Sequence, residues 1–276
     1  MENEIELKIM LYPQNIPMIK TWLNQLNVLE YQQNILGNTY YDSPNLFFAK
    51  NKMGLRVRNK NHQYELTLKT EGNIIGGLHI RPEYNLSLED KQPDLEKLIT
   101  HFNLNLPPIS PLEVTFTTNF TRETWLISFQ NTQIEIALDQ GKVKNNYAEE
   151  NICELEFELK QGDLKDLFRL LFNMPKYDCM WLSSLSKAQR GYLIGQPDEI
   201  AKNIEKLSAC QSQNLSKTQK YQQAQQIIDL FRLEPHHLKL KQLIQQIITD
   251  KEDISTYIYS SEYLNQNLME LQQQFT

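Results

Sequence analysis

Hydrophobic and polar residues alternate along much of the chain before residue 195, the pattern of half-buried β-strands, whose successive side chains point to opposite faces. The alternating segments cover residues 4–11, 39–42, 55–58, 64–70, 125–129, 134–139 and 153–160. In three other segments apolar residues recur every three or four positions, which predicts helices at residues 16–26, 94–102 and 164–172. Residues 59–62 lie between two strands and predict a hairpin connection. Many short antiparallel strands with few helices predict an α+β fold built on a barrel or a sandwich.

The composition changes near residues 195–197. All nine glycines precede this point, and 14 glutamines follow it. Apolar residues in this last part recur at helical spacing, as at Leu240, Leu243, Ile244 and Ile247, which predicts a small helical bundle rather than a disordered tail. We therefore expect two domains, residues 1–196 and residues 197–276.

The polar faces of the predicted strands carry segregated charges. Residues 4–8 place Glu4, Glu6 and Lys8 opposite an apolar face, and residues 153–160 do the same with three glutamates. Residues 55–58 carry two arginines instead. A single strand of this kind is usually half exposed to solvent. Because carboxylates and guanidinium groups gather on different strands, we interpret these faces as the lining of one polar interior, where each buried ion needs a partner, solvent or a ligand.

A polyphosphate bridged to divalent cations fits such an interior. Mg²⁺ and Mn²⁺ take oxygen ligands, and Mg²⁺ usually shares its coordination shell with substrate phosphates. Arginine presents a planar fork to phosphate oxygens, and lysine presents a compact charge. The carboxylates available are Glu4, Glu6, Glu154 and Glu156. The cations available are Lys8, Arg56, Arg58, Lys69, Arg81 and Arg122.

The net charge and the composition of the chain disfavour several kinds of binding partner. The chain has 276 residues and a formal net charge of −6, which disfavours binding to nucleic acid or to an anionic membrane. No apolar run approaches the roughly 18 to 20 residues of a membrane-spanning helix, and the start of the chain lacks the pattern of a signal peptide. The cysteines, Cys153, Cys179 and Cys210, lack the spacing of a disulfide framework or a zinc site. We expect a cytoplasmic protein with no nucleic acid or membrane partner.

Eight ordered segments resemble the CYTH domain family, the triphosphate tunnel metalloenzymes. The first, residues 4–8, matches the ExExK signature of that family. The others are residues 40–44 (YYDSP), 54–58 (GLRVR), 65–70 (ELTLKT), 77–84 (GLHIRPEY), 139–141 (DQG), 153–160 (CELEFELK) and 186–192 (SKAQRGY). The resemblance covers about residues 1–195, and the RPEY and SKAQRGY segments are most similar to the bacterial inorganic triphosphatase branch.

The resemblance implies an eight-stranded antiparallel β-barrel that forms a tunnel and hydrolyses inorganic triphosphate to diphosphate and phosphate with Mg²⁺ or Mn²⁺. It implies that Glu4, Glu6, Glu154 and Glu156 bind metal and serve catalysis together with Lys8. It assigns Glu158 and Asp139 as further metal ligands, with Asp139 and Glu83 also orienting the basic groups. The phosphate-binding residues that it implies are Lys8, Arg56, Arg58, Lys69, Arg81, Arg122, Lys187 and Arg190, the last two from a helix that plugs one end of the tunnel.

Three other functions remain open from the sequence. An enzyme of this type could hydrolyse an organic triphosphate, such as thiamine triphosphate or a nucleotide. A non-catalytic polyphosphate-binding module is a second alternative, and an interaction scaffold with solvent-facing charges is a third. Residues 197–276 are too few for the helical CHAD domain that follows the tunnel in longer relatives. They could be a shortened remnant, a support for the tunnel or the surface of a homodimer.

Overall fold

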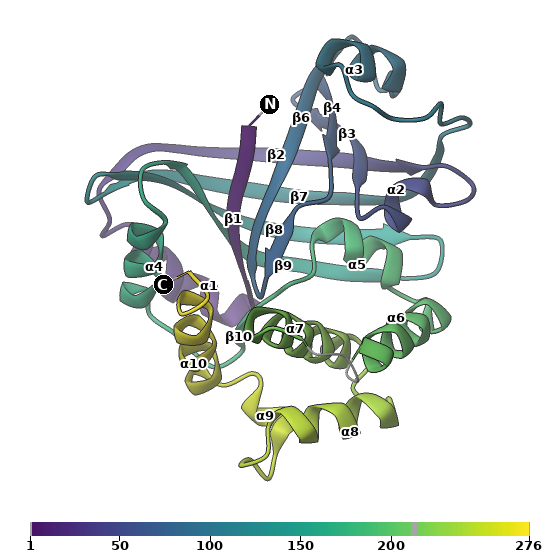
Figure 1. Ribbon diagram of the computed structural model, residues 1–276. Coiled ribbons are helices and arrows are strands. Elements are labelled where there is room, and N and C mark those ends of the chain that lie inside the picture. Colours follow the sequence, from purple (N-terminus) through teal and green to yellow (C-terminus); the bar gives the residue numbers. More distant parts are fainter. Residues whose placement is uncertain (1, 211–214, 276) are drawn as a thin grey trace.

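The structure is a computed structural model that describes residues 2–210 and 215–275, and a closed antiparallel β-barrel dominates it (Figure 1). The eight barrel strands are β1 (Glu2–Leu11), β2 (Val28–Asp42), β3 (Gly54–Lys60), β4 (Gln63–Lys69), β6 (Leu78–Leu88), β7 (Glu113–Phe129), β8 (Thr132–Asn145) and β9 (Glu149–Gln161). They pair in the order β1-β9-β8-β7-β2-β3-β4-β6, and β6 pairs with β1 to close the barrel. The predicted eight-stranded barrel is confirmed.

Two short strands extend the sheet beyond the closed barrel. β5 (Asn73–Ile75) pairs with β6, and β10 (Met180–Leu182) pairs with the end of β1. The alternation of residues predicted only parts of β2 and β7, which run 15 and 17 residues. The first half of β2 is largely exposed on both faces and mixes apolar and polar residues without a period of two, so no alternation marks it, and backbone pairing with β7 defines it instead.

The hairpin between β3 and β4 is the predicted one. Lys60 pairs with Gln63, which leaves a two-residue loop. Both loop residues have positive φ angles, 53° at Asn61 and 63° at His62. Two successive left-handed residues form the turn whose twist matches that of the flanking strands, and asparagine tolerates this conformation well.

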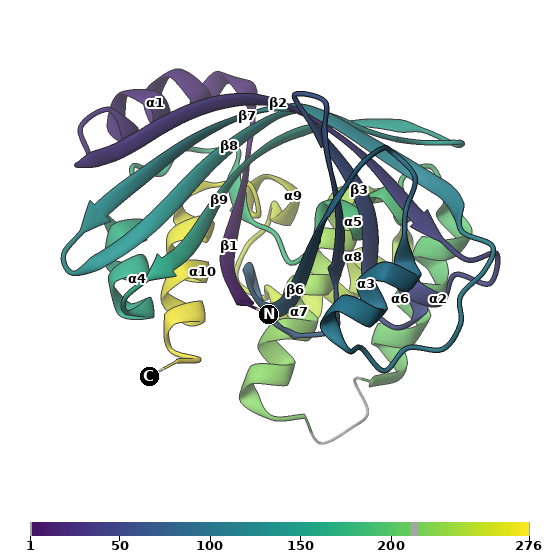
Figure 2. The same cartoon turned by 90° about the horizontal axis from the view of Figure 1, so that it is seen from above.

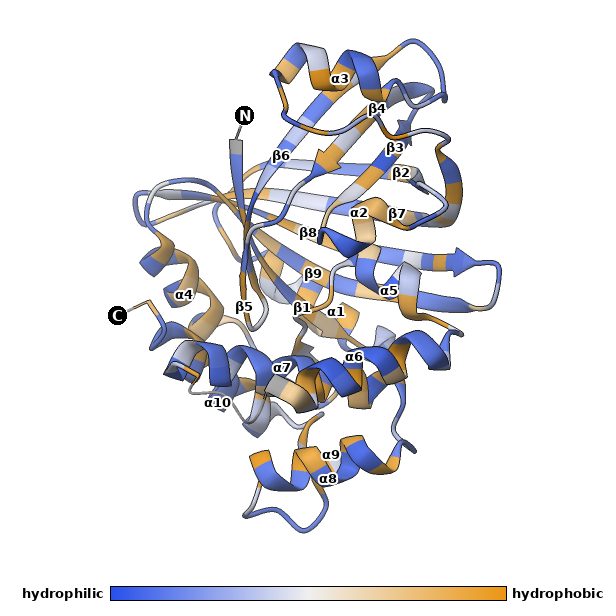
Figure 3. Cartoon of the chain, turned by 45° about the vertical axis from the view of Figure 1, so that its right-hand side comes forward, coloured by the Kyte–Doolittle hydropathy of each residue, from blue (hydrophilic) through white to orange (hydrophobic). Residues whose placement is uncertain are grey.

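The apolar faces of the barrel strands point outward, and helices cover them. Leu7, Leu155 and Phe157 are fully buried in one hydrophobic cluster with residues of the helices outside the barrel. Figure 2 shows α1 lying along the outside of the sheet beside β2, and Figure 3 shows apolar and polar residues alternating along the strands. The elements before residue 195 that accompany the barrel are η1 (Pro13–Asn15), α1 (Ile16–Leu23), α2 (Phe47–Lys50), α3 (Leu95–Phe102), α4 (Leu164–Asn173) and α5 (Lys187–Leu193).

The three helices predicted in the first 195 residues are confirmed. Side chains just before two of them explain where they begin, because Asp94 and Asp163 each accept a hydrogen bond from a backbone N–H of the first turn. α1 ends at Leu23, three residues earlier than its apolar spacing indicates. None of the helices in the described ranges is long and apolar enough to cross a membrane.

The last part of the chain is helical, as predicted. Its helices are α6 (Pro197–Cys210), α7 (Lys217–Leu233), α8 (Leu238–Ile247), α9 (Ile254–Tyr257) and α10 (Ser261–Gln272), and they lie together beside the barrel in Figure 1. Ser216 and Gln219 form a capping box that begins α7. Tyr221 and Leu268 belong to the same hydrophobic cluster as the barrel, so this part packs on the barrel directly. The division into two domains at residue 196 stays a prediction.

The outward-facing core generates a stability prediction. We expect Phe157→Ala to lower the free energy of unfolding by about 3–5 kcal/mol, because it removes a fully buried ring and leaves a cavity. Ile35, on the exposed part of β2, is 74% exposed, so Ile35→Ala should change it by less than about 0.5 kcal/mol. Urea denaturation of both variants measures the difference. Equal losses would contradict the placement of the core outside the barrel.

Candidate active site

The barrel lumen is part of a cavity of about 2070 Å³ that charged side chains line. The predicted site residues that line this cavity are Glu4, Glu6, Lys8, Arg56, Arg58, Lys69, Arg81, Glu83, Arg122, Glu156, Glu158 and Lys187. They come from β1, β3, β4, β6, β7, β9 and α5. The structure therefore brings together in one lumen the charged strand faces that the sequence places far apart.

A buried group of carboxylates lies at one end of the lumen: Glu156 lines the cavity, and Asp139 and Glu154 are fully buried and do not line it. Oxygen atoms of Asp139, Glu154 and Glu156 lie within 4.8 Å of one another. Two lysines enter this group. Lys8 Nζ lies 2.9 Å from Glu156 Oε1 and 3.3 Å from Glu6 Oε1, and Lys187 Nζ lies 2.6 Å from Asp139 Oδ2. The lysines neutralise acids that would otherwise repel one another.

The pKa directions agree with this pairing. Burial raises the pKa of Glu156, but Lys187 and Lys8 outweigh it and hold that pKa well below its ordinary value. Burial also opposes ionisation of Asp139, and Arg122 and Lys187 outweigh it in the same way. The carboxylates in turn raise the pKa of Lys8 despite its burial. These groups are therefore all charged at neutral pH.

The carboxylate group suits a hard divalent cation. Its donors are all oxygen atoms, the ligands that Mg²⁺ and Mn²⁺ prefer. Among the described residues, Glu6 Oε1 and Glu154 Oε1 are buried and have no hydrogen-bond partner, although both pair with Lys8 and Glu154 Oε1 also pairs with Lys187. A cation bound to these oxygens would take the place of the lysine ammonium groups.

The structure separates the predicted metal ligands. Glu4 lies apart from the buried group and pairs with Lys69 at 2.6 Å and with Arg81 at 3.5 Å. Glu158 pairs with Lys160 at 2.8 Å, and burial raises the pKa of its carboxyl group. The residues best placed for one shared cation are therefore Asp139, Glu154 and Glu156, with Glu6 beside them across Lys8.

Arginines dominate another wall of the lumen. Arg122 pairs with Asp139 at 2.6 Å and also with Glu156, and Arg56 lies 3.8 Å from Glu83. Arg58 differs from both, because no carboxylate of the described residues lies within ion-pair distance and its Nε donates to Asn38 Oδ1 at 2.9 Å.

The lack of a carboxylate partner leaves an excess of positive charge at Arg58. Burial, together with the nearby charges of Arg56 and Arg122, lowers the pKa of Arg58 to about 10. Its guanidinium group remains charged at neutral pH. An anion bound here would relieve the repulsion among the three arginines.

Helix α5 closes the acidic end of the lumen. Ser186 and Gln189 form a capping box that begins the helix, and Lys187 and Arg190 follow on one face, three residues apart. Arg190 does not line the cavity. It lies beneath the lumen, where it pairs with Glu154 at 3.2 Å and Glu150 at 2.9 Å. Its observed contacts are those of a residue that fixes the acidic strand β9.

Comparison with models of protein families gives one match for the part of the chain that forms the barrel. The model of the CYTH domain family matches residues 2–192, which include all of the barrel and almost all of α5. The chain belongs to the CYTH family. The match ends before α6, so the C-terminal helices lie outside it.

A curated relative of this CYTH chain is the inorganic triphosphatase of Haemophilus influenzae. The two are 45% identical over 196 residues, which are 71% of this chain and 56% of the relative. This chain therefore spans little more than half the length of that relative.

Solved structures of similar shape share little sequence with this CYTH chain. A Bacillus halodurans protein described as a candidate adenylate cyclase is 19% identical, with a TM-score of 0.44 over 63% of this chain and 90% of its own. The Mimivirus capping enzyme triphosphatase is 16% identical, with a TM-score of 0.41 over 63% of this chain and 88% of its own.

Two residues were missed from the sequence: Tyr40, which lines the cavity of this CYTH domain, and His79, which is buried next to it without lining it. His79 is fully buried and pairs in register with Glu6; burial, with Arg81 and Lys8 nearby, lowers its pKa to about 3, so the ring is neutral. Tyr40 lies in the cavity lining beside Arg56. His79 lies two positions before Arg81 on β6, so both side chains point to the same face. This period of two could have indicated His79 from the sequence.

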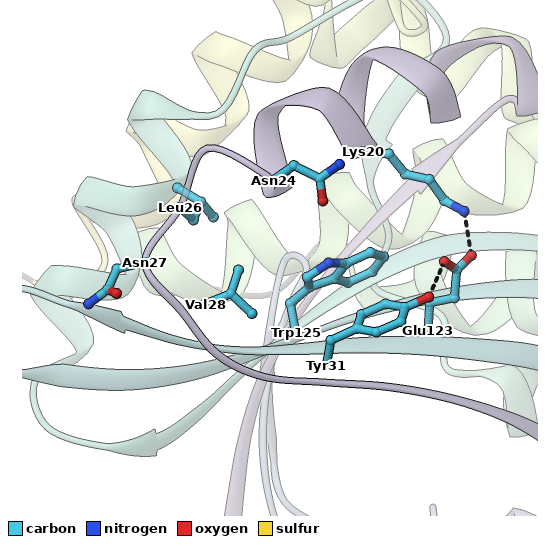
Figure 4. A pocket seen from close by; sticks show the side chains of 8 residues that line it. All are labelled: Lys20, Asn24, Leu26, Asn27, Val28, Tyr31, Glu123 and Trp125. Atoms are coloured by element: carbon cyan, nitrogen blue, oxygen red, sulfur yellow. Dashed lines mark hydrogen bonds and ion pairs between the residues drawn. The ribbon is translucent and has the colours of Figure 1, made fainter.

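A second cavity, of about 550 Å³, lies on the outside of the barrel between α1 and strands β2 and β7 (Figure 4). Its charged groups already have partners, because Glu123 accepts from Lys20 Nζ at 2.6 Å and from Tyr31 Oη at 2.9 Å. None of the predicted site residues lines it. The candidate active site of this CYTH domain is therefore the lumen.

The ion pairs of Glu83 generate a pH prediction. Burial opposes ionisation, but Lys69 and Arg56 lower the pKa of Glu83 from 4.5 to about 2. A carboxyl with a lowered pKa stabilises the fold above its unfolded pKa, and this contribution is lost as the pH falls toward the folded pKa. Between about pH 5 and pH 3, we expect Glu83→Gln to lose less stability than the wild type, by on the order of 1–3 kcal/mol. Denaturation at several pH values measures this, and parallel pH profiles would contradict it.

Proposed function

We propose that this protein hydrolyses inorganic triphosphate to diphosphate and phosphate inside the barrel lumen, with Mg²⁺ or Mn²⁺ as cofactor. The observation that carries the proposal is Arg58, a cation without a carboxylate partner among the described residues, which faces the lumen beside Arg56 and Arg122. A chain of phosphates is the ligand that such a wall binds best. The inorganic triphosphatase relative supports the same substrate.

The arginine wall holds the substrate in this mechanism. Arg56 and Arg58 lie on alternate positions of β3, so both guanidinium groups point to the same face and can contact successive phosphate groups. Lys69, on the paired strand β4, extends this wall. These residues bind the substrate and orient its phosphorus atoms for in-line attack.

The carboxylate group would hold the metal. Glu154 and Glu156, with Asp139 and Glu6 beside them, would supply the oxygen ligands. A bound Mg²⁺ or Mn²⁺ would lower the pKa of a water molecule and offset charge on the phosphate oxygens. Their low pKa values keep Asp139 and Glu156 ionised, which favours cation binding over proton transfer.

Lys8, Lys187 and Arg122 neutralise charge on the phosphoryl group that is transferred. All three contact the carboxylates in the structure and line the same cavity. With the carboxylates bound to a cation, the ammonium and guanidinium groups would be free to contact phosphate oxygens. Stabilising charge on the transferred phosphoryl group lowers the barrier without a side-chain nucleophile.

An organic triphosphate is the second candidate substrate. The cavity continues beyond the lumen to α6 and α7, where the side-chain amides of Asn203, Gln219, Gln222 and Gln226 line it together with Lys202 and Lys206. Neutral amides suit hydroxyl or ring-nitrogen groups better than further phosphates. This part of the cavity supports a substrate with an organic group at one end of the triphosphate.

The ligand, the cellular location and the partners of the protein are also part of the proposal. We propose a small-molecule triphosphate as the ligand, a cytoplasmic location and no nucleic acid or membrane partner. A homodimer through the C-terminal helices would cover exposed apolar side chains there, of which Leu238 is 76% and Met269 is 52% exposed.

Phosphate release from inorganic triphosphate, ATP and thiamine triphosphate tests the proposed substrate. Each assay is run with Mg²⁺, with Mn²⁺ and with a chelator. We expect metal-dependent turnover that is fastest for inorganic triphosphate. Faster turnover of an organic triphosphate would select the second candidate, and no turnover of any substrate would contradict a hydrolytic function.

Glu156→Gln tests the carboxylate group. The change keeps the shape of the side chain and removes the charge that two lysines and Arg122 surround, so we expect kcat to fall by about 100-fold or more while the far-UV circular dichroism stays the same. Glu149→Gln is the control, because Glu149 lies on the same strand, is exposed and pairs with Lys142 outside the lumen. Wild-type turnover in Glu156→Gln would remove Glu156 from the active site.

A further inference from the structure

The position of helix α5 cannot come from the helix itself. α5 has seven residues, and helices shorter than roughly 12–15 residues are marginal in isolation. Nevertheless it delivers the charged ends of Lys187 and Arg190 to buried carboxylates on β8 and β9. Contacts between α5 and the elements packed around it must therefore fix its position.

The barrel makes some of those contacts, because Asn145 of β8 donates to the carbonyl oxygens of Gly191 and Ile194 and Tyr192 packs on Phe116. The C-terminal helices make the others. Leu185, just before α5, and Leu193, its last residue, belong to a hydrophobic cluster whose other buried members are C-terminal. The rest of that cluster consists of Ile200, Ile204, Ile227, Ile228, Leu230, Phe231, Leu240, Leu243, Ile244, Ile248, Ile258 and Tyr263. Both ends of α5 are thus anchored in apolar contacts outside the family match, which ends at residue 192.

One buried carboxylate adds a specific polar link to these apolar contacts. Asp229 of α7 is 3% exposed, and its Oδ2 accepts hydrogen bonds from the backbone N–H of Ser184 at 2.6 Å and from its hydroxyl group at 2.7 Å. The preceding N–H, that of Ser183, donates to the carbonyl oxygen of Lys8 at 3.2 Å. The segment that leads into α5 is therefore tied to a lumen strand on one side and to α7 on the other.

Arg232 fixes the orientation of Asp229. Its Nη1 donates to Asp229 Oδ1 at 2.9 Å, and its Nη2 donates to the carbonyl oxygen of Ile258 at 2.7 Å. The guanidinium group also lies over the rings of Trp181 and Tyr259, 5.2 and 5.5 Å from their centres. A charge buried in this way is costly unless it is fully paired, and Ser184 completes the pairing of Asp229.

We propose that Asp229 is a positioning residue of the active site: it holds the segment 183–186, and through it the plug helix α5, so that Lys187 reaches the lumen. The C-terminal helices thereby act on the phosphate site from behind the plug. This inference deepens the proposed function and rests on it only for the role of Lys187 in phosphate binding.

Amide hydrogen exchange tests the positioning without any substrate. We expect Asp229→Asn to raise the exchange rates of residues 187–193 by about tenfold, because one partner of two hydrogen bonds to the preceding segment loses its charge. Asp253→Asn is the control, since Asp253 is an exposed carboxylate that caps α9 in the same part of the chain. Its exchange in α5 should match the wild type. Unchanged exchange in Asp229→Asn would overturn the proposal.

A double-mutant cycle tests whether the effect reaches the site through Lys187. Calorimetry with inorganic triphosphate and a chelator measures binding without turnover. Asp229→Asn should weaken binding about tenfold in the wild-type background and less than about twofold in a Lys187→Ala background. Equal losses in both backgrounds would overturn the route through Lys187.

The two proposals can fail separately. If the wild type neither binds nor hydrolyses triphosphate, the proposed function fails, while the exchange of α5 still decides the role of Asp229. If Asp229→Asn does not fold, Ser184→Ala replaces it. That variant removes the hydroxyl bond alone and should give changes of the same direction of about threefold, and no change would overturn the proposal.

Discussion

The balance of charge inside the barrel is the constraint on which the rest of the structure depends. Acids on β1, β8 and β9 and cations on β3, β4 and β7 face one lumen, and none of them could remain ionised in an apolar interior without a partner. The apolar faces of the same strands must then point outward. A barrel of this kind needs helices around it, and α1, α4 and α10 contribute to the cluster that buries its outer face.

The same constraint gives the lumen its chemistry. On the acidic side, Lys8 and Lys187 compensate the carboxylates. On the basic side, Arg58 has no carboxylate partner among the described residues, so the wall is incomplete without an anion. In the proposed function, a triphosphate would supply the negative charge that the arginine wall lacks, and its metal would supply a cation for the carboxylates. The plug helix α5 brings Lys187 to the point where the two sides meet, and the C-terminal helices support it from behind.

The sequence predicts the barrel and much of the lumen because period-two alternation assigns each charged residue to a face. Three features lie beyond that reach. The exposed first half of β2 carries no alternation, and its pairing with β7 defines it instead. Glu4 does not join Glu154 and Glu156, because it forms ion pairs with Lys69 and Arg81 instead. The link from Asp229 to Ser184 joins residues 45 positions apart, and no local pattern encodes it.

Anomalous diffraction from crystals soaked with Mn²⁺ and triphosphate tests the central claim most directly, because it locates the cation independently of the phosphate. The account predicts a manganese peak among Asp139, Glu154 and Glu156, with the phosphate chain running from it toward Arg56 and Arg58. A manganese peak away from these carboxylates, or a triphosphate bound outside the lumen, would contradict it.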